Sequence, residues 1–142
     1  MSIFITTFLT IFTFVVGQII AQIFIKPIQK QKELVGEINF ALFYYANYYY
    51  IDDKFGKMNK NQIKELEKAK DEIRKLGSRL KSSTKILPFY NFFSKINFVL
   101  KDSKIEEIFS GCIGWSNSIF ETVDKKDRLE FRKKIAKALN IN

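Results

Sequence analysis

Residues 2–25 read SIFITTFLTIFTFVVGQIIAQIFI, and this stretch decides the architecture that the sequence predicts. None of these residues carries a charged side chain, and most are Ile, Phe, Val or Thr. A helix of about 20 apolar residues is long enough to cross the hydrocarbon core of a bilayer. A soluble domain of the remaining length would not need a core helix of this kind. We therefore expect residues 1–27 to form a transmembrane helix.

A cleaved signal peptide is the main alternative for an apolar segment at this position. Such a peptide has a basic region, a shorter apolar core and a cleavage site between small residues. Here no Lys or Arg precedes the core, and Ile20-Ala21-Gln22 is a poor cleavage site. We therefore expect the segment to remain in the mature protein as a single-pass anchor.

The charges that follow the apolar segment predict its orientation. Lys26, Lys30 and Lys32 come directly after it, whereas no basic side chain precedes it. Basic residues next to a membrane helix favour the cytoplasmic side. The expected location is the cell (inner) membrane, with the N-terminus outside and residues 28–142 forming a cytosolic domain.

One face of the predicted membrane helix gathers small and polar side chains at 100° per residue. This small-polar face comprises Thr6, Thr10, Thr13, Gly17 and Ala21, with Gln18 and Gln22 to one side. Small residues let helix backbones approach, and a glutamine amide in hydrocarbon favours a hydrogen bond to a second helix. We expect this face to mediate self-association. In the alternative, the threonines bond within their own helix and the glutamines reach the cytoplasmic interface.

The rest of the chain carries apolar residues at the three-four spacing of helices. Helices are expected over residues 28–50, 60–82, 89–96, 103–123 and 125–139, with connections at 52–56 and 82–88. Pro27 should kink or restart the helix, because it lacks a backbone donor. Ser103 and Glu106 form a capping-box pattern, and Asp124 can cap the last helix. The predicted fold is all-α, with one transmembrane helix followed by a bundle of about four helices.

The residue composition argues against an enzyme. The chain has no His and one Cys, which excludes His-based catalysis, His-ligated metals and internal disulfides. The segment 114–118, Gly-Trp-Ser-Asn-Ser, resembles part of a nucleophile elbow but lacks its second glycine. Cys112 is expected to be an inert core residue, and Glu37 and Asn39 to be buried polar partners of the core. We expect no catalytic residue, no metal and no cofactor.

The excess of basic residues predicts that the protein binds an anionic surface or an acidic partner. The chain has 24 Lys and Arg against 15 Asp and Glu, a net charge of +9. In the last predicted helix, the residues expected to contact an anionic surface are Lys126, Lys133, Lys134 and Lys137. Each basic residue near an anionic leaflet contributes about 1 kcal/mol of binding. Lipid contact is the favoured interpretation, and nucleic acid is the alternative.

Several motifs resemble those of a family of small, uncharacterised bacterial single-span membrane proteins. They are Gly17-Gln18, Lys26-Pro27-Ile28-Gln29, Lys32, Gly36-Glu37-Ile38, Tyr44-Tyr45-Ala46-Asn47, Arg79-Leu80, Pro88-Phe89-Tyr90 and Ile113-Gly114-Trp115-Ser116-Asn117-Ser118. The resemblance implies a membrane anchor with a helical cytosolic part, and no known activity. In layout alone, the chain is also similar to ring-forming membrane accessory proteins of RNA-targeting CRISPR systems. Those have a degenerate higher-eukaryote and prokaryote nucleotide-binding fold, whose Arg…His ribonuclease motif is absent here.

Together these observations predict a non-enzymatic, membrane-anchored helical protein that self-associates. It would act as an anchor, a scaffold or a membrane effector in contact with the lipid bilayer. The alternative is a membrane tether that binds an acidic partner or nucleic acid through its basic helix faces.

Overall fold

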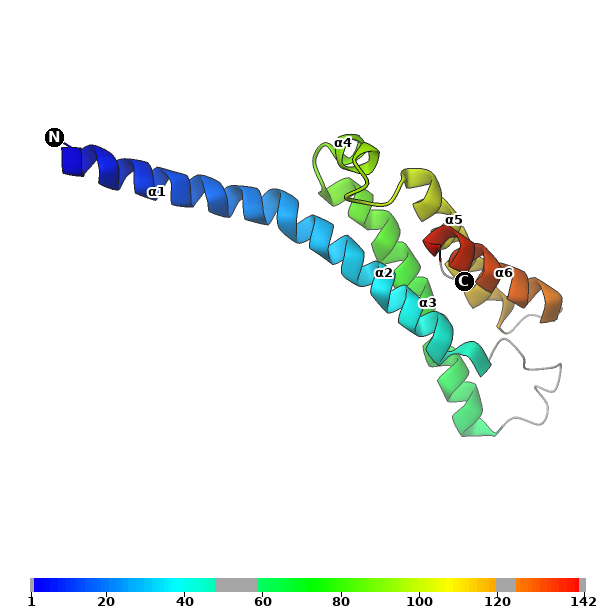
Figure 1. Cartoon of the computed structure of the whole chain (residues 1–142). Helices are drawn as coiled ribbons and strands as arrows, with labels where there is room; N and C mark the ends of the chain where they lie inside the picture. Colours follow the sequence, from blue (N-terminus) through cyan, green and yellow to red (C-terminus); the bar gives the residue numbers. More distant parts are fainter. Residues whose placement is uncertain (1, 48–58, 120–124, 141–142) are drawn as a thin grey trace.

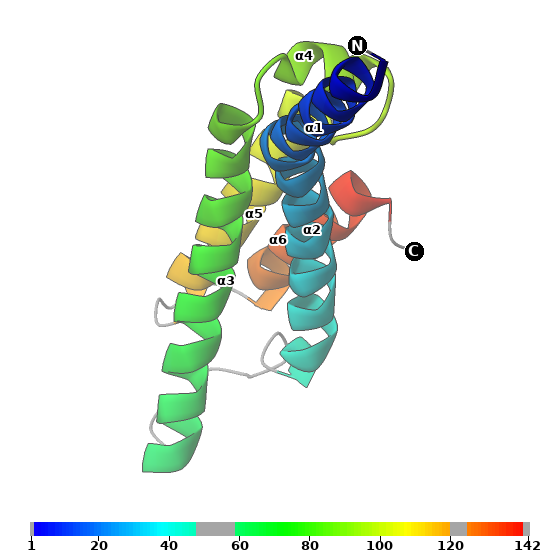
Figure 2. The same ribbon diagram turned by 90° about the vertical axis from the view of Figure 1, so that its left-hand side faces the viewer.

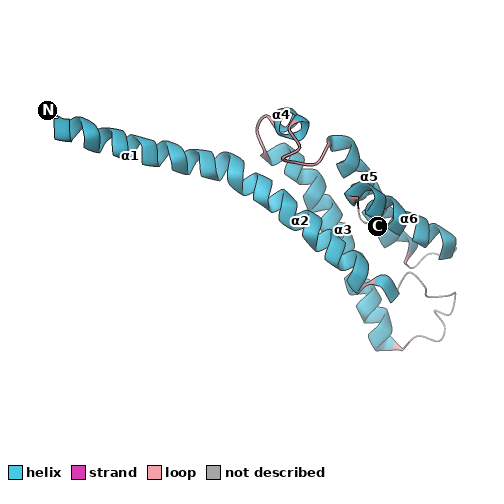
Figure 3. Cartoon of the chain, in the orientation of Figure 1, coloured by secondary structure: helices cyan, strands magenta, loops and turns pink. Residues whose placement is uncertain are grey.

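The protein is a long N-terminal helix that leads into a helical bundle (Figure 1). The structure is a computed structural model and describes residues 2–47, 59–119 and 125–140. These residues form helices joined by short connections, and no strand occurs among them (Figure 3). The predicted all-α class is confirmed.

The N-terminal helix continues without a break from the apolar segment into the bundle. It consists of α1 (Ser2–Ile20), a π-helical turn η1 (Ala21–Ile25) and α2 (Lys26–Tyr44). The continuous helix Ile3–Tyr44 has 42 residues, and its apolar part is long enough to cross a membrane. Figure 1 shows α1 projecting away from the bundle, and that apolar part is not buried against any other element that the structure describes.

Pro27 explains the π turn that joins the two parts of this helix. A proline has no N–H to donate, and its ring clashes with the carbonyl four residues earlier, here Ile23. The preceding turn widens instead, and Lys26 N donates to Ala21 O, five residues back. The helix therefore bends rather than restarts. Because a π turn accommodates one extra residue, the faces of α2 are rotated by about 100° relative to those of α1.

The bundle consists of α2, α3 (Lys60–Ile86), α5 (Asp102–Ser118) and α6 (Lys125–Leu139), packed in chain order. Neighbouring helices run antiparallel, as cross-contacts show. Gln31, near the beginning of α2, bonds to Ser83, near the end of α3. Tyr45, directly after the end of α2, bonds to Glu72, in the first half of α3.

The same antiparallel arrangement holds for the later helices. Lys81 pairs with Glu106 between α3 and α5, and Lys104 pairs with Asn140 at the end of α6. The beginning of α2, the end of α3, the beginning of α5 and the end of α6 therefore share one end of the bundle. We call it the proximal end, because α1 joins the bundle there. The short helix α4 (Tyr90–Lys95) also lies at this end, in the connection from α3 to α5 (Figure 2).

Glycines let the bundle helices approach closely. A Cβ atom on Gly77 of α3 would lie 2.7 Å from Cys112 Cβ, and one on Gly111 of α5 would lie 2.5 Å from Ile135 Cγ1. Both distances are shorter than van der Waals contact, so only glycine fits. The fully buried Trp115 is the largest side chain of the core.

Several predicted helix ends were wrong. α2 ends at Tyr44 rather than at 50, and α5 ends at Ser118 rather than at 123. α3 continues through Ser82, Ser83 and Thr84, because each hydroxyl donates to a carbonyl three residues earlier within the helix. It ends at Ile86, where Pro88 disfavours a helical conformation of the residue before it.

The predicted capping box at Ser103 and Glu106 was also wrong. α5 begins at Asp102 with Lys101 as its N-cap, and Glu106 pairs with Lys81 instead. A capping box does occur at the start of α3, where Asn59 and Gln62 exchange two hydrogen bonds. The expected turn at 52–56, the aromatic residues 48–50 and the cap at Asp124 lie outside the described residues.

Candidate functional site

A buried polar node fixes the proximal end of the bundle. Gln31 of α2 is 3% exposed, and its Nε2 donates to Ser83 Oγ at 3.1 Å and to Tyr90 Oη at 3.0 Å. Its Oε1 accepts a hydrogen bond from Leu100 N at 2.9 Å, and Tyr90 Oη donates to Leu100 O at 2.6 Å. One side chain therefore joins α2, α3, α4 and the segment before α5. Burial raises the pKa of Tyr90, so its phenol stays protonated and can donate.

Gln31 was not predicted as a functional residue, although the sequence holds a signal for it. Gln31 lies among charged and polar residues in QKQKE (29–33) and reads as a surface residue. Its spacing to Leu34, Ile38 and Tyr45 nevertheless places it on the same buried face of α2. A polar residue at such a position must find hydrogen-bond partners within the fold.

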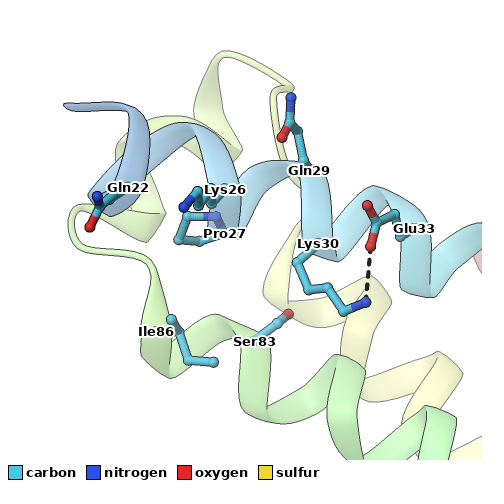
Figure 4. Close-up of a pocket in the computed structure, with 8 residues that line it drawn as sticks. All are labelled: Gln22, Lys26, Pro27, Gln29, Lys30, Glu33, Ser83 and Ile86. Atoms are coloured by element: carbon cyan, nitrogen blue, oxygen red, sulfur yellow. Dashed lines mark hydrogen bonds and ion pairs between the residues drawn. The ribbon is translucent and has the colours of Figure 1, made fainter. Parts of the chain in front are cut away.

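A hollow of about 440 Å³ opens beside this node, between the beginning of α2 and the end of α3 (Figure 4). It is lined by Gln22, Lys26, Pro27, Gln29, Lys30, Glu33, Ser83 and Ile86. Lys30 Nζ lies 2.9 Å from Glu33 Oε2. The hollow offers the Lys26 ammonium, the Lys30–Glu33 ion pair and glutamine amides beside the apolar surfaces of Pro27 and Ile86.

A second hollow, of about 530 Å³, lies against the other side of α2. Lys32, Lys101 and Lys104 contribute its charges, and Lys104 Nζ donates to Asn140 Oδ1 at 2.9 Å. The three lysines predicted for the membrane interface are thus divided. Lys26 and Lys30 border the first hollow, and Lys32 borders the second.

The sequence around the proximal end is basic and lacks acidic residues over a long stretch. No Asp or Glu occurs between Glu72 and Asp102, whereas Lys85, Lys95 and Lys101 all fall in this interval. The end of α3, α4 and the approach to α5 therefore carry positive charge toward the side on which α1 leaves the bundle.

α4 presents exposed aromatic side chains from a strained backbone. Phe89, the N-cap of α4, has φ 55° and ψ 35°, in the left-handed region, and is 73% exposed. This conformation costs a bulky residue on the order of 1–3 kcal/mol. Leaving the ring in water forfeits about another 1.5–3 kcal/mol that burial would provide.

From Thr6 to Gln18, the small-polar face lies outside the bundle. Gly17 has no atom within 4 Å of a hypothetical Cβ, so a second helix can approach its backbone. The threonines at positions 7 and 10 donate to carbonyls four residues earlier, at 2.9 and 2.8 Å. These two hydroxyls need no partner from another helix.

The two glutamines of this face differ in their surroundings. Gln18 is exposed on α1, above the π turn, and makes no side-chain hydrogen bond to any described residue. Gln22 borders the first hollow beside Lys26, as Figure 4 shows. Its position favours the alternative in which this glutamine reaches the interface.

The four lysines of α6 do not gather with those of the proximal end. Lys126, Lys133, Lys134 and Lys137 are all exposed. At 1.5 Å per residue, the ends of this 15-residue helix are about 21 Å apart. Lys137 lies close to the proximal end, and Lys126 lies at the opposite end of the bundle.

Cys112, Ser116 and Asn117 are held by burial or by hydrogen bonds within the bundle. Cys112 is fully buried, and this burial raises the pKa of its thiol to about 12. Ser116 Oγ donates to Ile113 O at 3.0 Å and accepts a hydrogen bond from Arg74 Nε at 3.2 Å. Arg74 also donates to Asn117.

The expectation for Glu37 as a buried core partner was wrong. Its side chain is 43% exposed and accepts a hydrogen bond from Arg79 Nη1 at 3.4 Å on the surface between α2 and α3. Among the described residues, no group of acidic or Cys side chains has an arrangement that could hold a metal ion.

No protein-family model, curated protein or solved structure matches the chain. The resemblance to small single-span membrane proteins therefore stays a prediction.

Proposed function

We propose that the chain is a single-pass membrane protein that self-associates and acts as an anchor, scaffold or membrane effector, without enzymatic activity. The observation that carries the proposal is the exposure of the N-terminal helix. Between Ile3 and Ile25, 13 large apolar side chains are at least 44% exposed. Covering each would contribute about 1.5–3 kcal/mol, and the sum exceeds the 5–15 kcal/mol that stabilises a typical domain. A bilayer covers such a helix on all sides.

The proposed location is the cell membrane, with the bundle in the cytoplasm. Lys26, Lys30 and Lys32 follow the apolar helix directly and favour this orientation. Fusing the C-terminus to a reporter that is active only in the cytoplasm, and in parallel to one active only outside, tests the orientation. We expect only the cytoplasmic reporter to be active, and the intact mass to include residues 1–25. Activity of the external reporter, or cleavage near residue 23, would refute the topology.

Self-association rests on the open approach to Gly17 and on the exposed amide of Gln18. In hydrocarbon, an amide hydrogen bond between helices contributes about 0.6–2 kcal/mol. Gly17→Ile should lower the yield of crosslinked oligomers most, because a branched side chain separates the two backbones. Gln18→Leu should lower it less. Val16→Leu, on the opposite face, is the matched control, and equal damage from that change would contradict the proposed interface.

The alternative function, a tether for nucleic acid or an acidic partner, is supported by the exposed lysines of α6. Gel mobility of the full chain in nanodiscs of neutral lipid, with single- and double-stranded nucleic acid at physiological salt, distinguishes the two. Under the leading proposal, binding is weak and disappears as salt screens the charges. Tight binding that Lys133→Glu abolishes would establish the alternative.

A further inference from the structure

The connection from α3 to α5 carries large apolar side chains that are exposed to solvent. Together with Ile86, the last residue of α3, they form what we call the aromatic collar: Ile86, Phe89, Phe92, Ile96 and Phe98. Their exposed fractions lie between 44% and 73%. The connection is only 15 residues long, from Leu87 to Lys101, and α4 is its single helix. A short connection of this composition in water would be expected to fold its rings inward.

The backbone holds the collar outward. Phe89 and Asn97 both have positive φ, at 55° and 60°, and they flank α4 on its two sides. The carbonyl of Phe89 accepts hydrogen bonds from Phe92 N at 2.9 Å and Phe93 N at 3.3 Å, which starts the helix directly after the left-handed residue. The two left-handed residues thus set the orientation of α4. The hydrogen bond from Gln31 Nε2 to Tyr90 Oη anchors α4 to α2.

The collar lies at the level where the apolar helix ends. The rings of Phe24, in η1, and Phe93, in α4, have centroids 5.7 Å apart, so the two elements are in contact. From Ile3 to Phe24, a helix rises about 32 Å at 1.5 Å per residue, which matches the roughly 30 Å of a hydrocarbon core. Figures 1 and 2 show α4 at the end of the bundle nearest to α1.

The charges around the collar select a bilayer as its occupant. Residues 86–98, which carry the collar, contain no acidic residue. Lys95 lies among them, and Lys85 and Lys101 lie just before and after them. Aromatic rings with lysines beside them are typical of the boundary between acyl chains and headgroups, where the rings are buried and the ammonium groups meet phosphates. A hydrophobic partner protein would not require this basic surround.

We propose that α4 and the aromatic collar insert into the headgroup boundary of the same leaflet from which α2 emerges, as a second membrane contact. This inference rests on the proposed membrane span. The contact would hold the proximal end of the bundle flat against the bilayer and bring both basic hollows to the phosphate level. Two membrane contacts, the span and the collar, then fix the orientation of the bundle, whereas the span alone would leave it free to rotate.

Depth-dependent fluorescence quenching tests this contact in the full chain. Separate variants carry Phe92→Trp or Phe89→Trp in the collar, Phe12→Trp in the middle of α1, and Phe40→Trp on α2. Phe40 is 63% exposed and is the matched control, because it lies about 21 Å further along the helix than Lys26. The proteins are reconstituted in phosphatidylcholine and phosphatidylglycerol vesicles with bromine at shallow or deep acyl positions. The native Trp115 is buried in the bundle and supplies a constant background that also reports folding.

We expect shallow bromine to quench most of the emission of the collar tryptophans, deep bromine to quench Phe12→Trp, and neither to quench Phe40→Trp. If Phe12→Trp is not quenched, the membrane span itself is refuted. If Phe12→Trp is quenched while the collar variants behave like Phe40→Trp, the span stands and the second contact is refuted. Collar emission that is blue-shifted but insensitive to bromine would show that protein covers the collar, and would also refute this inference.

Discussion

Replacing Gln31 with Leu removes the polar node of the proximal end without changing the size of the side chain greatly. In the native fold, Gln31 Oε1 is the acceptor for Leu100 N, and Nε2 donates to Ser83 and Tyr90. Ser83 still donates to Leu80 O, and Tyr90 still donates to Leu100 O. The main loss is therefore the acceptor of Leu100 N, a part-buried N–H.

Leaving a part-buried donor without its acceptor costs up to about 1–3 kcal/mol, and the lost bonds to two hydroxyls add to it. We expect Gln31→Leu to lower the free energy of unfolding by about 2–3 kcal/mol, partly offset by the apolar replacement. Urea unfolding of the full chain in detergent micelles measures the change. The emission of Trp115, the single tryptophan, reports it from the centre of the bundle.

Gln29→Leu is the matched control for this change. Gln29 lies two residues earlier on the same helix but is exposed at the edge of the first hollow. Surface substitutions of this kind typically alter stability by less than about 0.5 kcal/mol. If Gln31→Leu proves as stable as Gln29→Leu, the node does not stabilise the proximal end, and the reasoning is wrong.

Three further predictions concern the bundle. Gly77→Ala should lower the free energy of unfolding by about 1–3 kcal/mol, because the added Cβ clashes with Cys112. Gly36→Ala, in open space on α2, should raise it by about 0.5–1 kcal/mol. Equal effects of the two changes in urea unfolding would contradict the packing. The Cys112 thiol, whose pKa burial raises to about 12, should react with a disulfide reagent at pH 8 only after unfolding, and rapid labelling of the native protein would show that it is accessible. The pKa of Tyr45 is raised by burial and by its hydrogen bond to Glu72, so its stabilising contribution should hold below about pH 10 and decline above it. Tyr45→Phe should therefore be less stable than wild type near neutral pH, with the deficit narrowing as pH rises past 10; a deficit that widens would refute the sign.

Periodic patterns in the sequence were sufficient to predict the helical class, because a helix follows from spacing over many residues. The positions of α3 and α6 and the short helix near Phe89 were predicted within a few residues. Helix ends were harder, since they depend on single hydrogen bonds. The hydroxyls of Ser82, Ser83 and Thr84 can stop a helix or bond within it, and only the surrounding packing determines which occurs.

The proximal end was largely beyond prediction, because it is built from residues far apart in the chain. Gln31, Tyr90 and Leu100 meet only when the antiparallel order of the helices is known. The left-handed backbone of Phe89 is likewise unexpected for a bulky residue and has no local sequence signal. The lysines at 26, 30 and 32 were recognised from charge alone. Their division between two hollows follows from the helix period, which places Lys32 about 200° around α2 from Lys30, and from the elements that pack on each side of α2.

We propose that the protein assembles in a membrane through the exposed face of α1. The most direct test is the mass of the protein in detergent micelles, measured by light scattering with the detergent contribution subtracted. We predict a protein mass that is a multiple of the 16.7 kDa protomer and that falls toward one protomer in Gly17→Ile. A protein mass of 16.7 kDa for the wild type at every concentration would contradict it.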